Sequence, residues 1–245
     1  MSIRLFQKKA NLPQSFGFLK TDLHSHILPG IDDGAKDVEE SLELVRGLHA
    51  LGYDRLIATP HILMELHPNS AATVLPALEQ LRSAVREAGL DVRIDAAAEY
   101  MMDDGFEPVL EAGNLLTLPG NRVLVEMGFI NPPPRLHDYL FRLQTKGYKP
   151  LLAHPERYLF LKDRFGEYQR LREIGCEFQL NLLSLHGYYG KPVRDTAQKL
   201  LKHNLIDFLG TDLHHARHLD NLQNLLTDSA AMSLLQRHTF KNTQL

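Results

Sequence analysis

Short apolar runs alternate with amphipathic helical patterns along almost the whole of this 245-residue chain. Seven runs read as β-strands, over residues 18–26, 55–62, 92–101, 122–129, 149–158, 176–185 and 205–215. We expect helices between and after them, over residues 37–51, 71–88, 104–111, 136–146, 166–174, 191–203 and 219–236. Regular alternation of this kind predicts parallel strands joined by right-handed crossovers.

Each of these runs ends near a polar side chain. The positions of these side chains help to distinguish an open sheet from a barrel. In chain order these residues are His24 and His26, His61, Glu99, Glu126, His154, Asn181, and then Asp212 and His214. In an open doubly wound sheet only strands near the switch point meet a shared ligand, whereas every strand of a barrel ends at one centre. No GxGxxG or Walker A motif opens the first helix, so nothing marks a nucleotide site. The sequence therefore favours an α/β barrel.

Imidazole and carboxylate groups dominate these strand ends. His24 and His26 lie two residues apart, so both side chains leave the strand on the same face, and Asp212 and His214 repeat that spacing. Glu99 and Glu126 close apolar strands, where bound cations would remove the cost of burying a carboxylate. A ligand set without thiolate suits Mn²⁺, Fe or Zn²⁺, and about nine candidates suit two or three clustered ions.

Arginines follow two of the strand ends. Arg157 lies three residues after His154 in HPER, and Arg217 lies three residues after His214 in HHAR. A guanidinium fork there matches the oxygens of a phosphate group. The alternative is a surface salt bridge, for example with Glu156.

Composition excludes other classes of function. The net charge is −3 without a long basic run, which gives no electrostatic footprint for nucleic acid. No apolar stretch has the length of a membrane span. The N-terminal segment lacks the apolar core of an export signal, and one cysteine, Cys176, permits no internal disulfide, so we expect a cytoplasmic protein.

The chain resembles the PHP superfamily (polymerase and histidinol phosphatase), and within it the metal-dependent protein-tyrosine phosphatases of bacterial capsule and exopolysaccharide clusters. The stretches that carry the resemblance are DLHSHILPGIDDGAKD, IATPHI, AAEYM, LVEMGF, LAHPERY, LNLLSLHGYYG and GTDLHHAR. They run from about residue 21 to residue 218. The resemblance implies a distorted (β/α)₇ barrel of one domain, with an N-terminal extension over residues 1–20, the barrel over 21–236 and a polar tail over 237–245.

The resemblance also implies a trinuclear centre that prefers Mn²⁺. His24, His26 and Asp212 would hold one ion, and Glu99 would bridge it to a second ion. Glu126 and His154 would complete the second ion. Asp33, rather than Asp32, would hold a third ion together with His61 and His214. Arg157 matches the phosphate-binding arginine of the family well, and Arg217 matches less closely.

The function implied is hydrolysis of phosphotyrosine by a metal-bound hydroxide. The substrate would be a phosphotyrosine protein, namely a bacterial tyrosine autokinase that governs capsular or exopolysaccharide synthesis. Tyr100, Tyr188 and Tyr189 are candidates for an aromatic rim around the substrate ring, or for loop packing. Alternatives are a small-molecule phosphatase of histidinol-phosphate type, a nuclease, and a non-catalytic scaffold of the polysaccharide machinery.

Cys176 is not expected to act as a nucleophile. Cysteine-dependent phosphatases use a C-x₅-R loop, but the residue six places after Cys176 is Leu182. The cysteine opens an apolar strand, where we expect a raised thiol pKa and little reactivity. The sequence leaves the oligomeric state and the proton donor for the leaving group open.

Overall fold

The computed structural model describes residues 13–245. Residues 1–12 of the expected N-terminal extension lie outside the described part of the chain. The strands are β1 (Thr21–Asp22), β2 (Arg55–Ala58), β3 (His61–Ile62), β4 (Arg93–Ala96), β5 (Glu99–Met101), β6 (Arg122–Glu126), β7 (Lys149–Ala153), β8 (Glu177–Asn181) and β9 (Phe208–Gly210). The helices are α1 (Val38–Ala50), α2 (Ala71–Glu87), α3 (Phe106–Ala112), α4 (Leu136–Thr145), α5 (Phe165–Glu173), α6 (Leu182–Leu185), α7 (Lys191–Lys202), α8 (Ala216–Thr227) and α9 (Ser229–Leu235).

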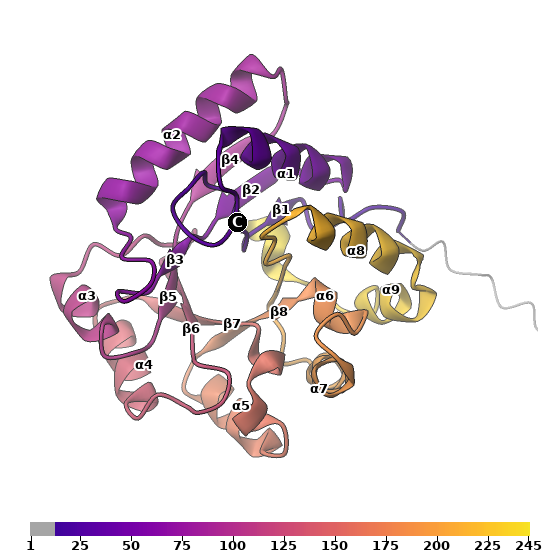
Figure 1. Cartoon of the computed structure of the whole chain (residues 1–245). Coiled ribbons are helices and arrows are strands. Elements are labelled where there is room, and N and C mark those ends of the chain that lie inside the picture. Colours follow the sequence, from indigo (N-terminus) through magenta and orange to yellow (C-terminus); the bar gives the residue numbers. More distant parts are fainter. Residues whose placement is uncertain (1–12) are drawn as a thin grey trace, which may run out of the picture.

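All strand pairs are parallel, as the alternation of elements predicted. They form a three-stranded sheet in the order β1-β2-β4 and a six-stranded sheet in the order β3-β5-β6-β7-β8-β9. The helices lie around the outside of the strands (Figure 1). The fold is therefore a mixed α/β fold of one domain.

The two sheets meet next to β1 and β9. The backbone N–H of His26 donates to the carbonyl of Leu213 at 2.8 Å, and that of Asp212 donates to the carbonyl of His24 at 2.7 Å. Ser25 and Leu213 form an isolated parallel bridge. The hydrogen-bonded strands nevertheless remain two open sheets, so a closed (β/α)₇ barrel is not confirmed.

Two of the expected strands are interrupted. The run 55–62 divides into β2 and β3 at Pro60, which has no N–H to donate to the ladder. The run 92–101 divides into β4 and β5, and the N–H of Glu99 still donates to the carbonyl of Pro60.

Two predictions of secondary structure were wrong, and a side-chain cap explains each. The run 176–185 leaves the strand at Asn181, whose side chain accepts from the N–H of Leu183 and starts α6. The helix expected over 219–236 divides at Asp228, whose carboxylate accepts from the N–H groups of Ala230 and Ala231 and starts α9.

The apolar interior receives side chains from both sheets. One buried cluster lies between them and comprises Leu23, Ile57, Ala97, Leu118, Leu124, Leu151, Ala153 and Phe208. Two larger clusters lie between the strands and the surrounding helices. The shared cluster fixes the two sheets relative to each other, and so fixes the strand ends.

The C-terminal segment packs against the strands, although its composition is polar. Asn242 is fully buried, and its side-chain amide donates to the carbonyls of Thr21 and Leu209. Its side-chain oxygen accepts from the N–H of Leu209 at 3.0 Å. One side chain therefore ties β1 to β9 at a point where the two sheets are not paired by their backbones.

Asn242→Ala should destabilise the protein. The change removes three hydrogen bonds and leaves buried backbone groups without partners, so the free energy of unfolding should fall by about 2–4 kcal/mol. Urea titration followed by circular dichroism measures this fall. Asn224→Ala, which changes an exposed asparagine on α8, is the matched control. Equal stability of the two variants would contradict the assignment.

Candidate metal centre

The nine candidate metal ligands all come from strand ends or from the loops that follow them. They meet in four overlapping groups whose possible ligand atoms lie within 4.8 Å of one another, namely His24, His26 and Asp212; His24, Glu99 and His154; His61, Glu99 and Glu126; and His26, Asp33, His61 and His214. Six strands or strand continuations contribute to a single cluster. The structure thus brings together every residue that the sequence nominated as a metal ligand.

The first group lies where the two sheets meet. The Nε2 atoms of His24 and His26 stand 3.4 Å and 3.5 Å from Oδ1 of Asp212. Oε2 of Glu99 lies 3.3 Å from Nε2 of His24 and 3.5 Å from Nε2 of His26. Glu99 therefore borders this group in the position expected of a bridging carboxylate.

A second group forms around Glu99 and Glu126. Nε2 of His154 lies 3.1 Å from Oε1 of Glu99 and 3.9 Å from Oε2 of Glu126. Nδ1 of His61 lies 3.0 Å from Oε1 of Glu126 and 3.2 Å from Oε2 of Glu99. Glu126 therefore lies closer to His61 than to His154, and His154 lies closer to Glu99 than to Glu126.

His61 also faces a third group. Its Nε2 lies 3.4 Å from Oδ1 of Asp33, and Nε2 of His214 lies 3.5 Å from the same oxygen. The resemblance assigned His61 to this group alone. In the structure its two ring nitrogens point to different groups, so it lies between them.

The spacing and chemistry of these atoms fit bound cations. Ligand atoms about 2.0–2.1 Å from an ion stand about 3.0–3.4 Å apart at tetrahedral or octahedral angles, and most separations above lie near that range. Nε2 of His24 and of His26, Nδ1 of His61 and Oε2 of Glu99 are buried without a hydrogen-bond partner among the described residues. Buried polar atoms rarely remain unpaired, so converging ones are typical of a cation site.

If no cation were bound, protons on the imidazoles would have to balance the negative charges of the carboxylates in the cluster. Burial opposes protonation of His24, but the carboxylates of Glu99 and Asp212 outweigh it and raise its pKa to about 9. Burial also disfavours the Asp212 carboxylate, yet His24 and His214 hold the pKa of Asp212 well below its usual range. Divalent ions would replace the imidazole protons at these positions.

Two residues that sequence reasoning did not select orient the imidazoles. Oε1 of Gln179 lies 2.8 Å from Nδ1 of His24, and Oδ2 of Asp32 lies 2.8 Å from Nδ1 of His26. Each oxygen accepts the Nδ1 proton and leaves Nε2 free to coordinate. Asp32 is buried, whereas the side chain of Asp33 is 57% exposed, so the two neighbours have different tasks. The DD pair was visible in the sequence, but nothing there marked Gln179.

Unusual backbone geometry aims two of the ligands. His154 and Asp212 have φ values of 32° and 51°, in the left-handed region that residues other than glycine seldom adopt. Both lie directly after a strand or one residue beyond it, where the turn directs the side chain to the cluster. Strain held by the surrounding structure is common at functional sites.

Gly34 is required for the loop that carries Asp32 and Asp33. A Cβ atom at this position would lie 1.9 Å from the carbonyl oxygen of His26. The loop can therefore approach the histidine closely only because residue 34 has no side chain.

The two arginines occupy different environments. Nη1 of Arg157 donates to Oδ2 of Asp212 at 2.7 Å, and the arginine side chain is 20% exposed. Arg157 therefore adjoins the first group. Arg217 lies exposed on α8, with its guanidinium carbon 6.0 Å from the ring centre of Tyr188. The structure places Arg157 at the cluster and Arg217 beyond it.

Two further residues lie away from the cluster. Tyr100 is buried, and its hydroxyl accepts from the N–H of Leu116, so it packs in the core and does not form a rim. Cys176 is 1% exposed, and burial raises the pKa of its thiol to about 12. The thiol therefore lacks the properties of a nucleophile, as expected.

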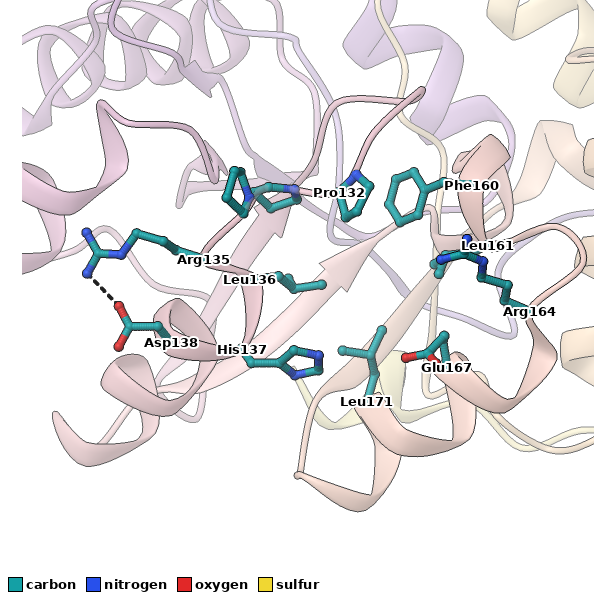
Figure 2. Close-up of a pocket in the computed structure, with 12 residues that line it drawn as sticks. Pro132, Arg135, Leu136, His137, Asp138, Phe160, Leu161, Arg164, Glu167 and Leu171 are labelled. Atoms are coloured by element: carbon teal, nitrogen blue, oxygen red, sulfur yellow. Dashed lines mark hydrogen bonds and ion pairs between the residues drawn. The ribbon is translucent and has the colours of Figure 1, made fainter.

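Two cavities flank the proline segment 132–134. One, of about 420 Å³, lies between this segment and α5, and Figure 2 shows Phe160 and Leu171 in its wall and the ion pair of Arg135 with Asp138 at its edge. It contains none of the candidate ligands. The other, of about 490 Å³, is lined by residues two places after His61, Glu99 and Glu126, namely Leu63, Met101 and Gly128. The second cavity thus shares three strand segments with the cluster, although no candidate ligand lines it.

Comparison with known proteins gives consistent matches. The family model described as capsular polysaccharide synthesis, CpsB/CapC, matches residues 20–235. Tyrosine-protein phosphatase YwqE of Bacillus subtilis is 32% identical over 197 residues, which cover 80% of this chain and 78% of that protein. Putative tyrosine-protein phosphatase CapC of Staphylococcus aureus is 30% identical over 203 residues, which cover 79% of this chain and 76% of that protein.

Solved structures agree with these sequence matches. A chain from the crystal structures of YwqE from Bacillus subtilis and CpsB from Streptococcus pneumoniae, described as unique metal-dependent tyrosine phosphatases, superposes with a TM-score of 0.76 and 30% identity. The match covers 90% of this chain and 96% of that one. Histidinol phosphate phosphatase from Lactococcus lactis, with a TM-score of 0.51 and 13% identity over 84% of this chain and 92% of that one, shows a similar fold.

Removing divalent ions should lower the melting temperature, and adding Mn²⁺ should restore it. An ion that binds only the folded state at a hundred to a thousand times its dissociation constant adds about 3–4 kcal/mol of stability. Differential scanning calorimetry of chelated and reloaded protein measures the change. His24→Gln should lose most of the response to Mn²⁺, whereas His137→Gln, at an exposed position on α4, should keep it. A response retained in full by His24→Gln would show that the cluster does not bind the ion.

Proposed function

The chain belongs to the CpsB/CapC family of capsular polysaccharide synthesis, and on that premise we propose that it is a metal-dependent protein-tyrosine phosphatase, a phosphoric monoester hydrolase. One observation carries the proposal: Asp212 faces two imidazoles with one carboxylate oxygen and binds Arg157 with the other. A candidate metal group and a guanidinium are thereby joined at one point. A purely structural metal site has no need of the arginine.

The proposed ion sites keep the ligand sets that the resemblance implies, except that His61 is placed between two of them. His24, His26 and Asp212 would hold one ion, and Glu99 would share it with a second ion that Glu126 and His154 complete. Asp33 and His214 would hold a third, with His61 between the second and the third. We propose Mn²⁺ as the preferred metal, with Fe or Zn²⁺ as alternatives and two or three ions in all. The catalytic unit in this proposal is a distorted seven-stranded barrel over residues 21–236.

The ions would supply an activated water and neutralise the oxygens of the phosphoryl group. The protein's own contribution centres on Arg157. Only its Nη1 has a hydrogen-bond partner among the described residues, so the other guanidinium donors can bind phosphoryl oxygens. The leaving tyrosinate has a reference pKa of about 10, so it needs less protonation than an alkoxide.

The proposed substrate is a tyrosine-phosphorylated protein, in particular a bacterial tyrosine autokinase of polysaccharide assembly. The family's association with capsular polysaccharide synthesis supports this choice. Within residues 13–245, no helix combines the length and the apolar character needed to cross a membrane. We propose that the protein acts in the cytoplasm, where the phosphorylated segment of such a kinase would be accessible.

Turnover of three substrates tests the proposal. With added Mn²⁺, a phosphotyrosine peptide should be hydrolysed with a kcat/KM at least tenfold above that of histidinol phosphate, and single-stranded DNA should remain intact. Release of inorganic phosphate measures the first two reactions, and gel electrophoresis measures the third. Preference for histidinol phosphate would support a small-molecule phosphatase. Absence of all three activities in fully metallated protein would support a scaffold.

Arg157→Lys should reduce kcat/KM for the peptide by about tenfold to a thousandfold. Lysine keeps the charge but loses the planar fork that makes charge-assisted contacts to phosphate. Metal content, measured by atomic emission spectrometry, should not change. Arg170→Lys, on the exposed face of α5, serves as the control. Kinetics of Arg157→Lys equal to those of the control would mean that Arg157 only pairs with Asp212.

A further inference from the structure

The segment Gly187–Gly190 (sequence GYYG) forms a tight turn that presents two adjacent tyrosines. Gly187 and Gly190 have φ values of 81° and 92°, and the N–H of Gly190 donates to the carbonyl of Gly187 at 2.9 Å. Glycine adopts this left-handed backbone without the strain that a side chain would cause. The turn lies between α6 and α7, just beyond the end of β8. Its tyrosines have no role in the metal groups.

The guanidinium of Arg157 lies close to two aromatic rings. Its central carbon is 4.3 Å from the ring centre of Tyr189 and 4.5 Å from that of Phe129. Both distances are well within the limit of about 6 Å for cation–π attraction. The rings come from different loops, Phe129 from the loop after β6 and Tyr189 from the GYYG turn.

Each ring also contacts other residues of the fold. Tyr188 packs edge-on against Tyr189, with ring centres 5.0 Å apart, and Nδ2 of Asn181 donates to the hydroxyl of Tyr189 at 3.1 Å. Tyr158 stacks on Phe129 at 6.0 Å. The rings of Tyr189 and Phe129 therefore have packing partners other than the arginine.

This arrangement leaves the edge of the guanidinium available. All donors of a guanidinium lie in its plane, and a ring stacked on a guanidinium face uses none of them. Nη1 donates to Asp212, and the remaining donors of Arg157 have no partner among the described residues. The rings also restrict the side-chain rotations that would turn the free donors away from the metal groups.

We propose that Tyr189 and Phe129 are positioning residues that hold Arg157 in the orientation that binds the phosphoryl group, an inference that rests on the proposed function. The ring of Tyr189 performs this task, and its hydroxyl does not. The GYYG turn positions that ring next to Arg157, and Tyr188 packs against it. Both rings act through Arg157 in this proposal. The ring centre of Phe129 also lies 5.8 Å from that of the candidate ligand His154, so Tyr189 is the ring that the test changes.

The test compares Tyr189→Ala with Tyr189→Phe in Mn²⁺-loaded protein. Tyr189→Ala should weaken the binding of inorganic phosphate, measured by isothermal titration calorimetry, by about fivefold to thirtyfold and lower kcat/KM for the phosphotyrosine peptide to a similar extent. Tyr189→Phe should restore both to within twofold of the unaltered protein. Metal content should be the same in all. Tyr148→Ala, a partly buried tyrosine just before β7, controls for lost packing and should change only stability.

A double-mutant cycle with Arg157→Lys separates positioning from a general structural effect. If Tyr189 acts through Arg157, the two losses in phosphate affinity should be clearly less than additive. Additive losses, an unchanged phosphate affinity in Tyr189→Ala, or failure of Tyr189→Phe to restore it would each overturn the proposal. Phosphate binding is measured without turnover, so an inactive but phosphate-binding protein would reject the proposed function and still decide this question.

Discussion

The carboxylate of Asp212 is the group that joins the first candidate metal group to Arg157. Its Oδ1 faces the imidazoles of His24 and His26, while its Oδ2 accepts hydrogen bonds from Arg157 and Asn181. The group is 2% exposed, so it exists as a carboxylate only because cationic and donor groups surround it. The first group of candidate ligands is arranged around that requirement.

Contact between the two sheets and assembly of the site use the same residues. The backbone hydrogen bonds from His26 to Leu213 and from Asp212 to His24 are the contacts that bring the two open sheets together at this edge. The side chains of His24, His26 and Asp212 form the first candidate metal group directly above them. An ion bound there would be coordinated by residues that follow strands of both sheets, so metal binding and folding should be thermodynamically linked. At the opposite end of β1 and β9, Asn242 ties the sheets without charge.

The strand ends could be predicted because parallel strands repeat one geometric rule. A side chain that follows such a strand reaches the shared edge, and only imidazoles and carboxylates at that edge are easily read as ligands. Gln179 could not be predicted this way, because an amide within a strand has many ordinary roles. The left-handed backbone of His154 and Asp212 could not be predicted either, because neither residue is a glycine, the residue type that usually indicates this conformation. The side-chain caps at Asn181 and Asp228 compete with apolar periodicity, and periodicity alone misplaced the elements around them.

The shared carboxylate also explains how one arginine can serve both the resting protein and a bound phosphoryl group. Asp212 is a buried carboxylate, and its hydrogen bond from Arg157, at 2.7 Å, is shorter than the one from Asn181, at 2.9 Å. Cations on Oδ1 would neutralise much of that charge and weaken its hold on Nη1. A phosphoryl group carries up to two negative charges and offers oxygens that match the guanidinium fork. In our proposal, the rings of Phe129 and Tyr189 would keep the guanidinium in place while its partner changes, because they attract the cation without occupying a donor.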